Sequence, residues 1–298
     1  MLDIKTIGFI GIGNMGRPMA ANLVKGGYQV VVYDLDGKRA REAAAGIGAK
    51  AAETLADLGK QADAIITMLP TGKEVRVCLF EAEAGALANN LPKGALVIDM
   101  SSSDPVGSRA THADCAKRGL AFVDAPVSGG VPRATDGTLA IMIGGDVAAV
   151  DAAKPVLAKM GKRLFAVGGP GNGHAMKALN NFVAGTAFIA VSEALLVGRK
   201  FGLDAATMVD VMNVSSGQSF NTEHVAKQHV VSRQFASGFA LGLLAKDVGI
   251  AADLANAIGV DSPLIGTSSA LLFEARDRVG AEKDHTLAYT YWESRDGK

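Results

Sequence analysis

The chain of 298 residues carries 30 basic and 30 acidic side chains, and 49% of its residues are hydrophobic. This length allows two domains with a large core, and zero net charge disfavours a nucleic-acid footprint or a basic membrane-binding face. The two cysteines show no metal-ligand spacing, no apolar signal segment begins the chain, and the longest apolar helical run, 182–191, is shorter than the roughly 20 residues that span a bilayer.

These features predict a soluble cytoplasmic protein that contacts neither nucleic acid nor membrane and carries no metal. Its first predicted elements form a β-α-β unit over residues 6–34: a strand, a G-x-G-x-x-G turn, a helix and a second strand that ends before Asp34. Gly11 permits the tight turn, Gly13 admits a pyrophosphate to the backbone, and Gly16 lets the helix pack on the strand. We expect dinucleotide phosphates to bind along this turn, at Gly11, Ile12, Gly13, Asn14, Met15 and Gly16.

Asp34 favours NAD over NADP, because its carboxylate can accept hydrogen bonds from ribose hydroxyls and would repel a 2′-phosphate. Lys38 and Arg39 follow in the next turn. They could meet a 2′-phosphate or simply form a solvated helix start, so NADP stays the less favoured alternative. A glycine-rich turn in another α/β protein is the alternative to a dinucleotide site, and the flanking strand, helix and acid argue against it.

Strands and helices alternate as far as residue 168, which predicts an α/β domain of the Rossmann type with a doubly wound, mainly parallel sheet. Leu69 and Pro70 follow one buried strand, and serines 101–103 follow the next, before a helix with Asp104 at its N-cap and Pro105 after it. These loops could contact a cofactor or serve only as strand-to-helix turns and caps. Buried strands are expected at 64–69 and 95–98, and further strands at 121–124, 139–143 and 163–167.

Almost no strand-like segment follows Gly168, so we expect an all-α C-terminal domain and place the domains at residues 1–168 and 169–298. A long helix over 173–200 is apolar on most faces, which is typical of a helix buried between domains or subunits. Asp204 is expected to cap the next helix. Further helices are predicted over 239–258 and 262–278.

Two groups of residues could carry chemistry. Ser128, Gly129 and Gly130 could form a nest of backbone N–H groups for a carboxylate or phosphate, or only a turn. Lys177 and Asn181, four residues apart on the apolar helix, project from one face. A partly buried lysine can pass a proton at neutral pH, and an asparagine can bind the same oxygen.

The alternative for Lys177 is a lysine that extends to water while the amide caps a neighbour. His174 lies three residues earlier without a recognisable partner, and we treat it as a flanking residue. Lys246 and Asp247, adjacent in a later apolar helix, could form a surface pair or face the cleft.

Four ordered motifs resemble those of the β-hydroxyacid dehydrogenases, a family that includes 3-hydroxyisobutyrate dehydrogenase and tartronate semialdehyde (2-hydroxy-3-oxopropionate) reductase. They are GFIGIGNMG, DAPVSGG followed by GTLAIMIGGD, G-x-x-x-K-x-x-x-N from Gly173 to Asn181, and AKDVGIAAD. The likeness covers nearly the whole chain, and the ending with Asp284, His285 and 289–293 is similar to the reductase branch.

The resemblance implies an NAD-dependent oxidoreductase that interconverts a small 3-hydroxy acid and its semialdehyde. Lys177 would transfer the proton, Asn181 would orient the reacting oxygen, and Ser128, Gly129 and Gly130 would hold the acid group. The cofactor would be contacted by Leu69, Pro70, Glu74, Ser103 and Lys246, with Asp247 positioning the last; Glu74 departs from the usual small or amide residue. The resemblance also implies a homodimer or homotetramer assembled through the helical domain.

Two other functions stay open, an imine reductase on the same fold and a non-catalytic dinucleotide-binding sensor. The intact Lys177 and Asp34 disfavour the first, and the intact Lys177, Asn181 and Ser128 disfavour the second. The sequence does not identify the substrate. Within segment 215–237, the side chains of His224, Lys227, His229 and Arg233 could bind a second anionic group, or be solvated cations on a surface helix.

Overall fold

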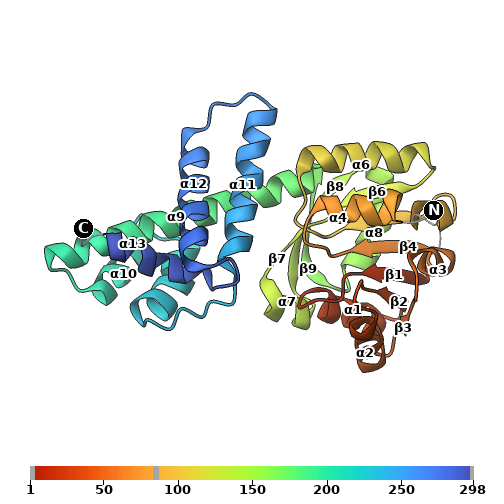
Figure 1. The fold of residues 1–298 in the computed structure, drawn as a ribbon, viewed down its shortest axis with the longest axis horizontal. Coiled ribbons are helices and arrows are strands. Elements are labelled where there is room, and N and C mark those ends of the chain that lie inside the picture. The colour runs from red at the N-terminus through yellow and green to blue at the C-terminus, as the bar shows by residue number, and fades with distance from the viewer. Residues whose placement is uncertain (1–3, 83–86, 296–298) are drawn as a thin grey trace. The chain divides into compact units, whose positions relative to one another are not determined.

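The computed structural model describes residues 4–82 and 87–295, which divide into two units, 1–177 and 178–298 (Figure 1). Residues 1–3, on which the expected lack of a signal segment partly rests, lie outside this range. Helix α9 (Asn172–Phe201) begins in the first unit and continues into the second. Each unit has its own hydrophobic core.

The first unit is built on a nine-stranded sheet, counted over its described residues, with the order β3-β2-β1-β4-β5-β6-β8-β7 and β9 beside β8. Neighbouring strands from β3 to β6 are parallel, β8 runs antiparallel to β6 and β7, and β9 is parallel to β8. The predicted doubly wound, mainly parallel sheet is therefore confirmed. The strands are β1 (Thr6–Ile10), β2 (Gln29–Tyr33), β3 (Lys50–Ala51), β4 (Ala64–Thr67), β5 (Leu96–Asp99), β6 (Ala121–Asp124), β7 (Val127–Ser128), β8 (Leu139–Gly145) and β9 (Gly161–Gly168).

Helices cover both faces of this sheet (Figure 1). Alternate residues of the central strands enter two separate cores: Ile66 and Ile98 pack in one, and Ile65 and Val97 in the other. The α-helices of this unit are α1 (Gly16–Lys25), α2 (Gly37–Ile47), α3 (Leu55–Gln61), α4 (Gly72–Arg76), α5 (Leu87–Asn90), α6 (Pro105–Lys117), α7 (Gly130–Asp136) and α8 (Val147–Leu157).

Local signals placed several helix ends correctly. Asp104 caps α6 by accepting the N–H groups of Val106 and Gly107, and Pro105 occupies its first turn. The two-residue strands β3 and β7 were not predicted, because so short a segment carries no hydrophobic period.

The second unit is all-α in its described residues, as predicted. Asp204 caps α10 by accepting the N–H of Thr207, and the π-helical segment η2 follows. The core of this unit includes Phe188, Leu244, Leu272 and Tyr289. Besides α9, its elements are α10 (Ala205–Asn213), η2 (Thr222–Val231), α11 (Leu241–Ala257), α12 (Pro263–Val279), η3 (His285–Leu287) and α13 (Ala288–Ser294).

Helix α9 is, in the described part of the chain, the one helix long and apolar enough to cross a bilayer. The helix is longer than the predicted apolar run, 182–191, because it also includes the more polar turns before and after that run. The side chains of His174, Asn181 and Ser192 are buried within it. A core helix of a folded unit passes the same length and composition test, and these buried polar groups favour that interpretation.

Candidate active site

In the turn between β1 and α1, two of the three glycines are required because neighbouring backbone atoms leave no room for a Cβ. Gly11 has a φ of +93°, and a Cβ there would lie 2.3 Å from the carbonyl oxygen of Met68. A Cβ on Gly16 would lie 1.8 Å from the carbonyl oxygen of Gly11. A Cβ on Gly13 would meet no protein atom within 4 Å, so the fold itself does not require this glycine. An open position at the N-terminus of α1 fits the close approach of a pyrophosphate.

Asp34 follows β2 and is held against this turn. Its carboxylate accepts the backbone N–H groups of Ile12 at 2.9 Å and Asp36 at 3.0 Å. Arg39 lies 3.5 Å from Asp34 and 3.6 Å from Asp36, while Lys38 pairs with exposed Glu42. The residue expected to select NAD is therefore fixed beside the glycine turn, and Arg39 is engaged by acids.

The loops after β4 and β5 are tied to each other. The backbone N–H of Leu69 donates to the hydroxyl of Ser101 at 2.9 Å. Ser103 is buried and its hydroxyl donates to Asp99 at 2.8 Å, which favours the alternative role of holding the turn. The Thr71 hydroxyl donates to Glu74, and this hydrogen bond lowers the pKa of the Glu74 carboxyl.

The Ser128 loop joins β7 to α7. Gly129 and Gly130 both have positive φ, +134° and +63°, a backbone conformation that other residues rarely adopt. A Cβ on Gly129 would also collide with the side chain of Arg133. The two glycines thus let the chain reverse directly after Ser128.

Lys177 and Asn181 lie one turn apart on α9. Asn181 is buried, and its amide nitrogen donates to Asp247 on α11 at 2.6 Å. The other carboxylate oxygen of Asp247 lies 3.4 Å from the ammonium of Lys246. Asp247 is only 4% exposed, so it is not part of a surface pair, and it contacts both Asn181 and Lys246.

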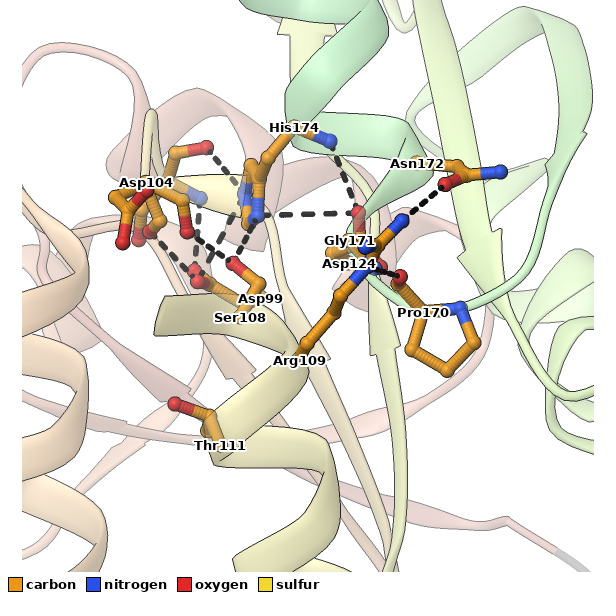
Figure 2. Close-up of polar contacts among 12 residues, drawn as sticks. Asp99, Asp104, Ser108, Arg109, Thr111, Asp124, Pro170, Gly171, Asn172 and His174 are labelled. Atoms are coloured by element: carbon orange, nitrogen blue, oxygen red, sulfur yellow. Dashed lines mark hydrogen bonds and ion pairs between the residues drawn. The ribbon is translucent and has the colours of Figure 1, made fainter. Parts of the chain in front are cut away.

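Three buried residues form a polar cluster that the sequence did not predict: Asp99, Asp124 and His174 (Figure 2). The ring of His174 lies 3.8 Å from a carboxylate oxygen of each aspartate. A signal was present in the sequence, because each aspartate ends a buried strand and the carboxyl ends of parallel strands meet at one edge of a sheet.

Three of the four cationic side chains of segment 215–237 lie beside acidic side chains. Lys227 pairs with Asp210 at 2.7 Å and Arg233 pairs with Glu293 at 2.8 Å. His224 is exposed and lies 3.7 Å from Glu223. These contacts favour the alternative interpretation, charged side chains at the surface, for these three residues. The half-buried His229 differs, because its Nδ1 has no hydrogen-bond partner among the described residues.

Neither cysteine is poised for nucleophilic chemistry. Burial raises the pKa of Cys78 to about 11 and that of Cys115 to about 12. Both therefore stay thiols at neutral pH.

A doubly wound sheet with an open glycine turn and a fixed acid at the end of β2 defines a dinucleotide-binding protein. Two family models agree. Residues 6–169 match the NAD binding domain of 6-phosphogluconate dehydrogenase. Residues 171–292 match the family described as NAD-binding of NADP-dependent 3-hydroxyisobutyrate dehydrogenase.

Similar proteins narrow the class. The NAD-dependent L-serine dehydrogenase of Pseudomonas aeruginosa is 36% identical, over 99% of this chain and 100% of the relative. The 3-hydroxyisobutyrate dehydrogenase of the same organism is 38% identical, over 93% and 94%. The structure of Mycobacterium tuberculosis 3-hydroxyisobutyrate dehydrogenase with L-serine has a TM-score of 0.89 at 33% identity, covering 97% of this chain and 99% of that one. The chain belongs to the β-hydroxyacid dehydrogenase family, and it is an NAD-dependent oxidoreductase acting on CH–OH groups.

Proposed function

We propose that this enzyme interconverts a small 3-hydroxy acid and its semialdehyde, with Lys177 as general acid and base. The observation that carries the proposal is the pair of Lys177 and Asn181 on one helix, with the Asn181 amide anchored by buried Asp247. An anchored amide can present its remaining polar atoms to a substrate oxygen without reorganising.

The chain's own residues divide the work. Lys177 takes the hydroxyl proton during oxidation and returns it to the carbonyl oxygen during reduction. Asn181 orients that oxygen, and Ser128, Gly129 and Gly130 hold the carboxylate through a hydroxyl and backbone N–H groups. Bound NAD supplies the hydride acceptor for oxidation, and NADH supplies the hydride donor for reduction.

Most of the proposed cofactor contacts and the Ser128 loop lie in the first domain, residues 1–168. The second domain, 169–298, supplies Lys177 and Asn181 for the reacting oxygen, Lys246 for the cofactor, and the surface for assembly. Asp34 meets the ribose, and the glycine turn meets the pyrophosphate. Leu69, Pro70, Glu74, Ser103 and Lys246 complete the proposed cofactor contacts.

The substrate class follows from the two named activities among the relatives. L-serine and 3-hydroxyisobutyrate are both 3-hydroxypropionates that differ in the group on the carbon beside the carboxylate. We therefore expect the substrate to carry a primary alcohol on the second carbon from the carboxylate, the 3-position of the acid. The enzyme is proposed to act in the cytoplasm as a homodimer or homotetramer.

The test is a turnover screen with NAD and NADP. It compares L-serine, 3-hydroxyisobutyrate, glycerate, 4-hydroxybutyrate and threonate, with semialdehydes and NADH for the reverse reaction. Turnover of a 3-hydroxy acid with NAD supports the proposal. Tight NADH binding without turnover of any of them contradicts the proposed substrate class.

Replacing Lys177 tests the proton-transfer role. Lys177→Ala should lower kcat by about 10²–10⁴-fold, the usual contribution of a general acid or base, with NADH affinity kept. Lys154→Ala, which removes an exposed lysine that pairs with Asp151 on α8, is the control and should behave like the wild type. Activity of Lys177→Ala within about tenfold of wild type, a barrier change near 1.4 kcal/mol, would contradict the assigned role.

A further inference from the structure

His174 is the one histidine among the described residues whose side chain has no solvent exposure and lies near two buried carboxylates. Its ring contacts two oxygens. Nε2 lies 3.1 Å from the backbone carbonyl of Ser101. Nδ1 lies 2.7 Å from the hydroxyl of Ser108 (Figure 2). The reaction as proposed above does not use this residue.

The hydrogen-bond partners require a proton on Nε2 and allow one on Nδ1. A carbonyl oxygen only accepts, so Nε2 must carry the hydrogen that is shared with Ser101. The Ser108 hydroxyl lies 2.9 Å from the carbonyl oxygen of Asp104 as well as 2.7 Å from Nδ1, and its single hydrogen can be donated to only one of them. When the hydroxyl donates to the Asp104 carbonyl, as serines within helices commonly do, Ser108 accepts from His174 and Nδ1 carries a hydrogen as well.

A ring with two N–H groups is a cation, and the surroundings supply matching charge. Nε2 lies 3.8 Å from Asp99 and Nδ1 lies 3.8 Å from Asp124. Both carboxylates are at most 1% exposed. Buried charges persist when they are paired and hydrogen-bonded, which is the arrangement here.

The other hydrogen bonds of Asp99 and Asp124 hold the loop after β5 and the start of α9. Asp99 accepts from Thr67, from the backbone of Ser101 and from Ser103, and so organises the loop after β5. Ser101 in turn accepts the N–H of Leu69.

Asp124 holds the start of α9. It accepts the backbone N–H groups of Gly171 at 2.8 Å and His174 at 2.9 Å, and thereby caps the helix from β6. Lys177 lies three residues beyond His174 on the same helix. Any change in the position of His174 is therefore carried to Lys177 through less than one turn of rigid helix.

We propose that His174 is an imidazolium held between Asp99 and Asp124, and that it is a positioning residue that fixes Lys177 relative to the loops after β4 and β5. The protonation assignment stands on the described hydrogen bonds together with the two buried carboxylates beside the ring. Its consequence for catalysis rests on the proposed function.

The protonation is measured without turnover. The full chain is labelled with ¹⁵N-histidine, and the five histidines are distinguished by comparison with His174→Gln. At neutral pH we expect both ring nitrogens of His174 to show the shifts and couplings of N–H groups. A ring with one bare nitrogen would overturn the assignment, whether or not any hydroxy acid is turned over.

The positioning role is measured by steady-state kinetics on His174→Gln, which keeps a donor of similar reach and removes the charge. We expect kcat to fall at least about tenfold, with the NADH dissociation constant within about threefold of wild type. With substrate deuterated at the carbon that gives up the hydride, the isotope effect on kcat should rise. The reason is that a misplaced proton-transfer group makes the chemical step slower than product release. An unchanged kcat would overturn the role.

His112→Gln is the matched control. His112 lies on α6 one turn after Ser108, is partly exposed and pairs with Asp146 at the surface, so its replacement should leave kcat within about twofold. If His174→Gln does not fold, Ser108→Ala replaces it and removes only the acceptor of Nδ1. That variant should still lower kcat and raise the isotope effect with NADH binding kept; wild-type kinetics would overturn the role.

Discussion

At the scale of single residues, a substitution at Gly13 should change cofactor affinity without changing the stability of the fold. A Cβ at this position meets no protein atom within 4 Å. We therefore expect Gly13→Ala to leave stability within about 0.5 kcal/mol of wild type, as for a surface substitution. The added methyl group occupies the approach of the pyrophosphate, so NADH affinity, measured by fluorescence titration, should fall at least about tenfold.

Gly16→Ala is the counterpart. A Cβ there lies 1.8 Å from the carbonyl oxygen of Gly11, which is backbone and cannot rotate away. We expect it to destabilise the protein by about 1–3 kcal/mol or more in urea unfolding. Equal NADH affinity of Gly13→Ala and wild type would contradict the proposed phosphate site.

Asp34 should set the cofactor preference. We expect Asp34→Ala to lower kcat/KM with NAD by about 10–100-fold, or about 1.4–2.7 kcal/mol, because the ribose hydroxyls lose their acceptor. Activity with NADP should be kept or improved, since Arg39 no longer pairs with Asp34 and can meet a 2′-phosphate.

The control is Asp36→Ala, which removes the N-cap of α2 and the other acidic partner of Arg39. It should cost about 1 kcal/mol of stability and keep the NAD preference. A wild-type kcat/KM that is higher with NADP than with NAD would contradict the role of Asp34.

At the scale of elements, the position of α9 depends on Gly173. A Cβ there would lie 2.6 Å from the carbonyl oxygens of Asp124 and Met142, so only glycine lets the helix start against β6 and β8. We expect Gly173→Ala to destabilise the protein by about 1–3 kcal/mol in urea unfolding and to lower kcat.

Gly266 on α12 provides the comparison, because its Cβ would meet nothing within 4 Å and its φ is not positive. Alanine is the better helix former at such an exposed position. Gly266→Ala should stabilise the protein by about 0.5–1 kcal/mol. Wild-type stability of Gly173→Ala would show that the first turn of α9 is not packed as described.

At the scale of the whole molecule, the second unit presents apolar surface suited to self-association. Val197 and Phe201, one turn apart near the end of α9, are 71% and 85% exposed. They border a hollow of about 660 Å³ together with Trp292, whose buried indole N–H has no acceptor among the described residues. A charge placed here should oppose burial against another subunit.

Val197→Glu should therefore shift the protein toward monomers in analytical ultracentrifugation, raising the dissociation constant at least about tenfold. Val147→Glu on α8 in the first unit replaces an equally exposed valine and is the control. A wild-type protein that stays monomeric at high concentration would contradict the proposed assembly.

The sequence alone determined the parts of this protein that local chemistry encodes. Apolar periods of two and 3.6 residues, with glycine and proline at their ends, located the β-α-β unit, the alternating sheet and the long helix α9. Ordered motifs of glycine, lysine and asparagine then indicated the cofactor and the family. Each of these features depends on residues that are close together in the sequence, so no distant contact is needed to recognise it.

Only the tertiary structure decided which side chains meet. Asn181 and Asp247 are 66 residues apart, and His174 lies 73 residues from its partner Ser101. His174 read as a flanking residue because its partners come from the ends of separate strands. The first contact joins helices α9 and α11, and spacing along the chain does not predict which helices pack together. The second forms where parallel strands bring their carboxyl ends to one edge of the sheet, so the sequence indicates the edge but not the partner.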